Sequence, residues 1–238
     1  MHPRFIASLA AGLIVSAFGI SVVPKPLGPT PVVVELFTSQ GCSSCPPAEA
    51  LISQLRNQPP VIPLAFHVDY WDHLGWKDAF SSPQWTQRQL MYVRAMHLRS
   101  AYTPQAVVNG SVEFVGSSPG RMTSAIREAS QRAAIGSVTV SASRSGNTIT
   151  ATVKADAPAG YDIVLALVEN QVRTRIEAGE NAGTIPMENA IVRRLRRVSN
   201  GTVTLPADPS WRDLGVVVFL QNRATLSIGN AAASYHLR

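Results

Sequence analysis

The sequence predicts an α/β domain over residues 31–135, followed by a smaller all-β, sandwich-like domain over residues 136–238. Two observations lead to this prediction. In the first range, short apolar runs rich in β-branched residues alternate with segments of helical periodicity, which is typical of an α/β sheet. In the second range, short strands are separated by turn residues, which is typical of an antiparallel sandwich. Both ranges have the usual size of a single domain.

The first domain is expected to open with a strand, a helix and a second strand. Residues 32–37 and 61–66 are short, mainly apolar runs, which predicts buried strands. Between them, apolar residues recur at helical spacing over 48–55, and Pro59 and Pro60 end this helix.

Two further helices and a hairpin are expected to complete the first domain. Residues 84–99 and 118–134 have the apolar periodicity of helices. Between these helices, residues 105–108 and 112–115 have the composition of strands. The Asn109-Gly110 pair joins the two strands and is a strong hairpin signal.

The second domain is expected to consist of strands. Residues 137–143 and 148–153 alternate strictly between apolar and polar residues. Three later segments also have a strand-like pattern, at 163–168, 202–205 and 215–220. Residues 191–198 could form either a strand or a helix, because their apolar residues also fit helical spacing.

The amino terminus has the pattern of an export signal. Arg4 supplies a positive charge, and residues 5–23 then carry none. The length of this stretch lies between that of a cleaved signal and that of an uncleaved membrane anchor, so both stay open for residues 1–23. The prolines in residues 24–30 predict an extended spacer. We therefore expect a periplasmic or secreted protein that contacts a membrane only through this segment and faces an oxidising space.

The formal net charge of +6 does not by itself indicate nucleic-acid binding. Basic residues cluster only within 191–198, as Arg193, Arg194, Arg196 and Arg197. A nucleic-acid site of this kind would need aromatic side chains for stacking, and none accompany the cluster. The pattern favours a solvated arginine face, so no nucleic-acid partner is expected.

The two cysteines, Cys42 and Cys45, lie between the first predicted strand and the first predicted helix. Two cysteines exclude a disulfide-rich scaffold and a four-cysteine zinc site. Thiol chemistry requires a thiolate, which the positive end of a helix macrodipole stabilises, and a second cysteine one turn away can resolve a mixed disulfide. The spacing therefore predicts Cys42 as an exposed attacking thiol and Cys45 as a more buried resolving thiol.

Other roles for the cysteine pair are weaker. A purely structural disulfide would close so short a loop that it contributes only about 2 kcal/mol. A copper or zinc site would need further ligands, for which His67, His73 and His97 are candidates, but a lone Cys-x-x-Cys lacks the second pair of such sites. We therefore expect no metal and no other cofactor. A metal-binding or chaperone-like envelope protein stays the alternative to redox chemistry.

Two further features are candidates for the same site. Thr103 and Pro104 precede a predicted strand, where a proline is often cis; the alternative is an ordinary loop proline. Glu35 lies inside an apolar strand, where a carboxylate is costly unless it is protonated or paired. We expect it to exchange a proton with Cys45, the alternative being a strand-edge residue that reaches solvent.

The segment 67–78 combines aromatic, acidic and histidine residues just after a predicted strand. The carboxyl ends of strands face the ligand crevice in open α/β sheets, so one hypothesis is a substrate or metal pocket lined by His67, Asp69 and His73. The other is a packed cap. We favour the packed cap, because aromatic residues at such density more often pack than bind.

Four segments resemble the exported thioredoxin-like proteins of domain-of-unknown-function family 1223. They are residues 34–49, 67–78 and 102–110, and 179–183 with 192–193. The order strand, Cys-x-x-Cys, helix, then Thr-Pro before a hairpin is also similar to the thioredoxin fold. The resemblance implies a thioredoxin-like first domain, in which Thr103 and Pro104 offer backbone groups to an extended substrate chain.

The sequence departs from ordinary thioredoxins at three positions. Gly41 stands where thioredoxins carry a tryptophan, Pro46 directly follows the second cysteine, and Glu35 lies one residue further from Cys42 than the buried aspartate of thioredoxins would. These departures leave the redox potential and the direction of electron flow open.

The residues and the resemblance together predict an exported thiol–disulfide oxidoreductase. Cys42 and Cys45 would carry the chemistry on disulfide- or thiol-containing proteins or small thiols, with Thr103 and Pro104 presenting the partner. The second domain would be a binding or docking module.

Overall fold

The computed structural model describes residues 30–237. The expected export signal at 1–23 and nearly all of the expected spacer at 24–30 lie outside this range. Within it, no helix is both long and apolar enough to cross a membrane.

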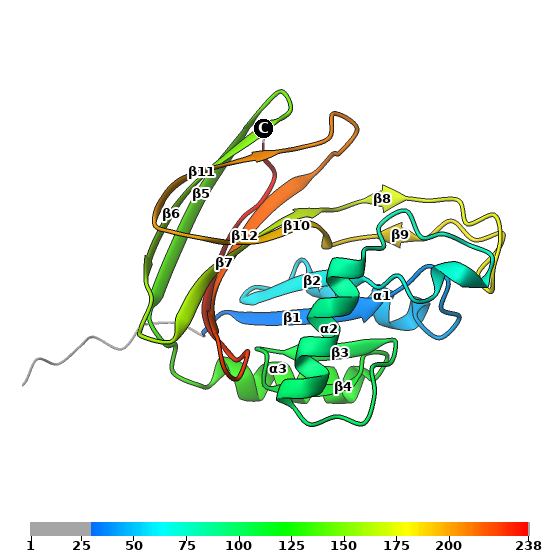
Figure 1. Ribbon diagram of the computed structural model, residues 1–238, viewed down its shortest axis with the longest axis horizontal. Coiled ribbons are helices and arrows are strands. Elements are labelled where there is room, and N and C mark those ends of the chain that lie inside the picture. The colour runs from blue at the N-terminus through cyan, green and yellow to red at the C-terminus, as the bar shows by residue number, and fades with distance from the viewer. Residues whose placement is uncertain (1–29, 238) are drawn as a thin grey trace, which may run out of the picture.

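The first half contains the expected alternation of strands and helices (Figure 1). Its elements are β1 (Val32–Thr38), α1 (Pro46–Leu55), β2 (Val61–His67), the 3-10 helix η1 (Asp72–Leu74), α2 (Pro83–Ala95), β3 (Gln105–Val108), β4 (Val112–Val115) and α3 (Pro119–Ser130). Helix α2 ends earlier than expected, and His97 shortly after it adopts a positive φ of 53°. Such a backbone conformation cannot continue a right-handed helix.

The second half is built of strands, as expected. They are β5 (Ser137–Ser145), β6 (Thr148–Asp156), β7 (Tyr161–Glu169), β8 (Val172–Arg173), β9 (Met187–Glu188), β10 (Ile191–Val198), β11 (Gly201–Pro206), β12 (Leu214–Asn222) and β13 (Ile228–Ser234). The segment that stayed open between strand and helix is therefore a strand, β10.

Strands from both halves form one mixed sheet of eight strands, in the order β13-β12-β7-β10-β2-β1-β3-β4. Strands β1 and β2 are parallel, and β10 joins the free side of β2, with Ile191 opposite Ala65. Every residue of β2 is buried. Backbone groups left unpaired on this side would therefore lack partners, so β2 requires a neighbouring strand there. The expected separate all-β domain is therefore not confirmed: four of the nine strands described in that range continue the sheet of the first half (Figure 1).

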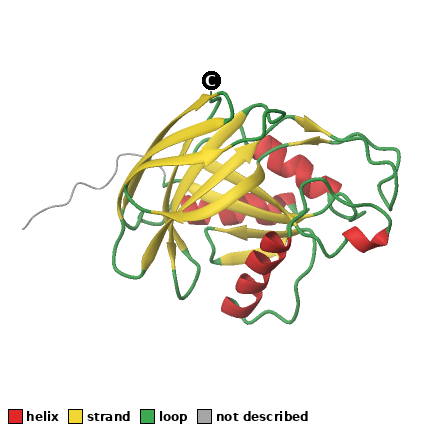
Figure 2. Ribbon diagram, turned by 45° about the horizontal axis from the view of Figure 1, so that its top comes forward, coloured by secondary structure: helices red, strands yellow, loops and turns green. Residues whose placement is uncertain are grey.

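The large sheet is covered on both faces. Apolar residues of β1, among them Val34 and Leu36, pack with Ala48 and Ile52 of α1 and with α3. On the same face, further along the sheet, the three-stranded sheet β11-β6-β5 packs against β7 and β12. Figure 2 shows these two layers of strands beside the helices.

Helix α2 covers the opposite face of the large sheet. Val33 and Phe37 of β1 pack with Tyr92 of this helix. Successive strand residues point to opposite faces, so the even-numbered residues of β1 face α1 and its odd-numbered residues face α2. This alternation decides which buried carboxylates lie on the side of the cysteines.

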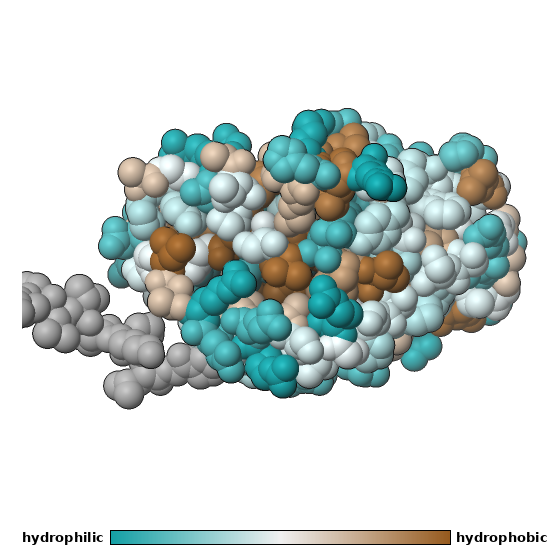
Figure 3. Space-filling model, turned by 90° about the horizontal axis from the view of Figure 1, so that it is seen from below, coloured by the Kyte–Doolittle hydropathy of each residue, from teal (hydrophilic) through white to brown (hydrophobic). Residues whose placement is uncertain are grey.

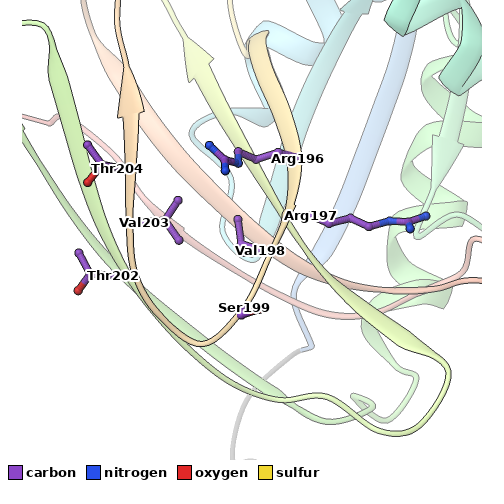
Figure 4. Close-up of a pocket in the computed structure, with 7 residues that line it drawn as sticks. All are labelled: Arg196, Arg197, Val198, Ser199, Thr202, Val203 and Thr204. Atoms are coloured by element: carbon purple, nitrogen blue, oxygen red, sulfur yellow. The ribbon is translucent and has the colours of Figure 1, made fainter.

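Two arginines of β10, Arg193 and Arg194, contact neighbouring side chains of the protein. Arg193 pairs with Glu169 at 2.6 Å, and the guanidinium of Arg194 lies 4.9 Å from the ring centre of Trp211. A shallow open groove between β10 and β11 contains Arg196 and Arg197 (Figure 4). The face seen in Figure 3 carries apolar residues as separate spots among hydrophilic ones.

Candidate functional site

Cys42 and Cys45 form a disulfide at the start of α1, with their Cα atoms 5.4 Å apart. Cys45 is the residue that precedes the first helical turn, and the prolines after it occupy that turn. There the missing proline N–H groups would have no helical partner. Both cysteines are 0% exposed, although Ser43 and Ser44 between them are exposed. The prediction of an exposed Cys42 is therefore wrong for the oxidised protein.

Residues 39–45, called the cysteine loop below, are anchored through Gln40. Its backbone N–H donates to Asp78 Oδ2 at 2.8 Å, and its side-chain Nε2 donates to Glu188 Oε2 at 2.8 Å. Its Oε1 accepts a hydrogen bond from Trp76 Nε1 at 3.0 Å. Gln40 is buried, and these partners come from two distant segments of the chain. The loop that carries the cysteines is thus tied to both halves of the molecule.

His67, the last residue of β2, lies between the two carboxylates that hold Gln40. Its Nδ1 donates to Asp78 Oδ2 at 2.7 Å, and its Nε2 is 4.0 Å from Glu188 Oε1. Burial favours the neutral ring, but the negative charges of Asp78, Glu188 and Glu49 outweigh it and raise the pKa of His67 to about 9. Burial also raises the pKa of Glu188, to about 7, against the lowering effect of His67.

These pKa values predict that the protein loses stability as pH rises above neutrality. The pKa of His67 is about 9 in the folded protein, against an ordinary value of 6.5. Its contribution is therefore complete below pH 6.5 and disappears as pH rises through about 9. Glu188 acts in the same direction through about pH 7. We expect the free energy of unfolding, measured in urea, to fall over this range.

The variant His67→Gln isolates this effect. It should lose most of the pH dependence between pH 6.5 and 9, whereas His236→Gln, at an exposed histidine, should keep it. An unchanged slope in His67→Gln would show that His67 does not carry the charge inferred for it.

The alternative hypothesis of a pocket lined by His67, Asp69 and His73 is not supported, because the three side chains have separate environments. His67 is buried against Asp78, and Asp69 accepts a hydrogen bond from Thr86 Oγ1 at 2.5 Å. His73 is exposed in η1. Among residues 30–237, no group of three or more histidine, cysteine or acidic side chains is arranged to hold a metal ion. Tyr70 and Trp71 of the segment pack against the hydrophobic core, which agrees with the packed cap that we favoured.

Trp71, from this packed segment, connects the cysteine loop with Thr103. A Cβ atom on Gly41 would lie only 3.2 Å from Trp71 Cβ, and Trp71 Nε1 donates to Thr103 Oγ1 at 2.9 Å. The peptide bond between Thr103 and Pro104 is cis. A glycine at position 41 therefore leaves room for Trp71, which contacts the cysteine loop and also binds Thr103.

Glu35 does not face the cysteines. Its two carboxylate oxygens accept hydrogen bonds from Arg88 at 2.6 and 2.8 Å, and the Tyr92 hydroxyl donates to it at 2.6 Å. Both partners belong to α2, on the face of the sheet opposite α1. Proton exchange between Glu35 and Cys45 is therefore wrong, because the alternation of β1 points this odd-numbered residue away from the cysteine helix.

Glu49 is a carboxylate of α1, the helix that directly follows the cysteines. It lies one turn after Cys45 on the same face of α1, and its N–H donates to the carbonyl of Cys45 at 3.2 Å. Its carboxylate accepts a hydrogen bond from Thr38 Oγ1 at 2.6 Å. Burial raises its pKa, although His67 and Thr38 act against this. The spacing of four residues from Cys45 was the signal that could have identified it.

A small cavity lies between Glu49, His67 and Glu188. Its volume of about 10 Å³ is close to the space that one water molecule needs. Within the described part of the chain, Glu188 Oε1 is a buried oxygen without a hydrogen-bond partner. Glu49, His67 and Glu188 thus line one small cavity beside α1. Glu188 comes from β9, so its place in this cluster depends on the tertiary fold.

Residues 175–184, called the cap loop below, connect β8 to β9 and contact the cysteine loop. Asn181 Nδ2 donates to the carbonyls of Gln40 at 2.8 Å and of Cys42 at 3.0 Å. Glu180 Oε2 accepts a hydrogen bond from the N–H of Ser43 at 3.2 Å. The strand-rich half thus contributes side chains directly to the disulfide site, which local sequence patterns could not indicate.

Two relatives are similar to this chain over different extents. A thioredoxin of Methanocaldococcus jannaschii is 32% identical over 85 residues, which cover 36% of this chain and 79% of the thioredoxin. A protein of Agrobacterium tumefaciens, whose crystal structure comes from a structural-genomics consortium, is 30% identical. The two structures match with a TM-score of 0.66 over 87% of this chain and 93% of the other.

The thioredoxin covers only part of this chain, whereas the crystal structure matches most of both halves. This chain has a mixed α/β, thioredoxin-like architecture, and its own Cys42–Cys45 disulfide lies at the start of α1. A family model described as "Protein of unknown function (DUF1223)" matches residues 33–221. The chain therefore belongs to the DUF1223 family.

Proposed function

We propose that the protein is an exported thiol–disulfide oxidoreductase that acts through Cys42 and Cys45. The observation that carries this proposal is the Cys42–Cys45 disulfide at the start of α1. A helix start stabilises a thiolate, and the short spacing lets either cysteine close the bond again. The similarity to a thioredoxin supports the same chemistry.

The reaction is an exchange of one disulfide for another. In the reducing direction, the Cys42 thiolate attacks one sulfur of a substrate disulfide, and the other substrate sulfur leaves as a thiolate. The Cys45 thiolate then attacks Cys42 Sγ, which releases the second substrate sulfur and forms the Cys42–Cys45 bond. Two electrons pass from the protein to the substrate, and the same steps in reverse oxidise a dithiol.

The partner is proposed to be a disulfide- or thiol-containing protein that lies against Thr103 and Pro104. The Pro104 carbonyl already accepts a hydrogen bond from Gly116 at 2.9 Å, so Thr103 is the better candidate to offer backbone groups. Export fits the same chemistry, because a disulfide persists in an oxidising compartment. The charge-free stretch at 5–23 would supply the export signal or an anchor.

The activity is tested with metal-free protein and insulin as the disulfide substrate. With dithiothreitol as the reductant, the protein should accelerate insulin reduction in proportion to its concentration. The absence of acceleration, together with tight binding of copper or zinc to the reduced cysteines, would overturn this proposal and favour the metal-binding alternative.

Glu49 is proposed to exchange the proton of Cys45. It lies on the same helix face one turn away, with its pKa raised by burial, so it can take the thiol proton when Cys45 becomes the attacking group. We expect Glu49→Gln to lower the turnover of insulin reduction at pH 7 by about 10²-fold, since general base catalysis contributes on this scale.

The matched control for this variant is Glu128→Gln, at an exposed glutamate of α3, which should leave turnover unchanged. A decrease in Glu49→Gln that is the same at all pH values between 5 and 9 would contradict proton transfer and indicate a packing defect instead.

A further inference from the structure

The cap loop has a defined structure of its own. The N–H of Ile176 donates to the carbonyl of Thr184 at 3.0 Å, and the N–H of Gly183 donates to the carbonyl of Ile176 at 2.8 Å. The Ile176 side chain is buried. Gly179 lies against Trp76, where an added Cβ would approach Trp76 Cβ to 3.1 Å. The base of the loop is therefore fixed, while its tip carries the residues that reach the cysteine loop.

The tip of the cap loop holds the cysteine loop through polar side chains. Asn181 uses one amide nitrogen for two backbone carbonyls, those of Gln40 and Cys42. Glu180 is exposed and accepts from Ser43. Figure 1 shows the β8–β9 connection at the same end of the sheet as the start of α1. These contacts are three hydrogen bonds, two partly buried and one exposed, so they can open without unfolding the sheet beneath.

The disulfide beside the cap loop is buried, which limits the access of other thiols to its sulfurs. A thiolate attacks a disulfide only if it can reach one of the two sulfurs, and both cysteines are 0% exposed. We propose that the cap loop covers the disulfide and has to leave the cysteine loop before a partner sulfur reaches Cys42, and that Asn181 is the positioning residue that holds it in place. The proposal rests on the proposed function, because it concerns access to the same cysteines.

The chemistry of the test is the reduction of the Cys42–Cys45 bond by an external dithiol. A dithiothreitol thiolate attacks Cys42 Sγ, the Cys42–Cys45 bond breaks, and Cys45 leaves as a thiolate that takes up a proton. The second dithiothreitol sulfur then displaces Cys42, which also takes up a proton, and the reductant ends as a cyclic disulfide. Two electrons pass to the protein, and no further reactant is needed.

The decisive experiment starts from the oxidised full-length protein and measures the rate of this reduction by counting free thiols in samples quenched with acid at successive times. Asn181→Ala removes the donor of both carbonyl contacts, so we expect reduction to become about tenfold faster or more. Asn200→Ala is the matched control, because Asn200, in the turn between β10 and β11, also binds backbone groups, the N–H and the carbonyl of Ala155 in β6. Its rate should stay within about twofold of the parent protein.

A second variant and a second reductant separate a mobile cover from a folding defect. Asn181→Asp keeps the shape of the side chain but places a carboxylate against two carbonyl oxygens, so its reduction should be at least as fast as in Asn181→Ala. The gain should be larger for reduced glutathione than for dithiothreitol, because a bulkier thiol needs a wider opening. In concentrated guanidinium chloride all variants should react at one common rate.

The outcomes distinguish this proposal from the proposed function. Equal reduction rates in the parent protein and both Asn181 variants would overturn the cover, even if the protein reduces insulin efficiently. Faster reduction in both variants would support the cover, even if no insulin turnover were found.

Discussion

Substitution of Cys42 by serine is expected to lower thiol-dependent insulin reduction by roughly 10³-fold or more, because loss of a nucleophile removes the first covalent step. The remaining Cys45 directly precedes the first turn of α1, and in the proposed mechanism it attacks Cys42 Sγ and not the substrate, so it does not replace the lost nucleophile. The measurement is initial turnover at pH 7 with dithiothreitol as the reductant.

Cys45→Ser makes the matching comparison. It should also lose turnover, but it should accumulate a mixed disulfide between Cys42 and the substrate, because no second cysteine resolves it. Mass spectrometry after acid quenching detects this species. A trapped adduct on Cys45 in the Cys42→Ser variant, with none on Cys42 in Cys45→Ser, would reverse the assigned roles.

Substitution of Arg88 by methionine should cause the largest loss of stability. Arg88 binds both oxygens of Glu35, which is 0% exposed, and its guanidinium also lies 5.2 Å from the ring centre of Phe66. Methionine fills the space of the side-chain stem but leaves the Glu35 carboxylate buried without its cation. Such a change costs about 3–5 kcal/mol. The free energy of unfolding in urea should fall by that amount.

Two comparisons show whether the lost charge is the cause. Arg223→Met removes a partner of Asp162 from a pair in which the arginine side chain is 60% exposed, so its cost should stay below about 1 kcal/mol. Replacing both members of the buried pair, as Glu35→Leu with Arg88→Met, should recover much of the stability lost in the single variant. A single-variant cost as small as that of Arg223→Met would contradict the inferred burial of the pair.

The order of elements in the first half was predictable because each has a local signal. The β-branched run of β1, the helical spacing after the cysteines, and the hairpin signal at Asn109-Gly110 each depend on neighbouring residues alone. The cis peptide at Pro104 also agrees with its place before a strand. These local signals predict that the cysteines lie between β1 and α1, where the disulfide is found.

The joining of the two halves could not be predicted in the same way. The apolar residues of β10 fit either a strand or a helix, and the pairing of Ile191 with Ala65 depends on which strand of the sheet lacks a neighbour. The contact between Asn181 and the cysteine loop likewise joins residues about 140 positions apart in the sequence. No local pattern records such a contact.

Glu35 and Glu49 show how the orientation of a residue in its strand or helix decides which carboxylate lies on the side of the cysteines. Glu35 was correctly expected to be buried and close to the cysteines along the chain, but its place in the strand points it toward Arg88. Glu49 lies four residues after Cys45 on a helix, where that spacing brings side chains to one face. The strand period of two and the helix period of 3.6, applied together, separate these candidates.

A redox titration of the Cys42–Cys45 pair tests the central claim most directly. The protein would be equilibrated in glutathione or dithiothreitol buffers of graded potential, and its free thiols counted after acid quenching. A catalytic pair should titrate reversibly as one two-electron couple at a potential between about −270 and −120 mV. A pair that stays oxidised until below about −300 mV would behave as a structural disulfide and contradict the proposed activity.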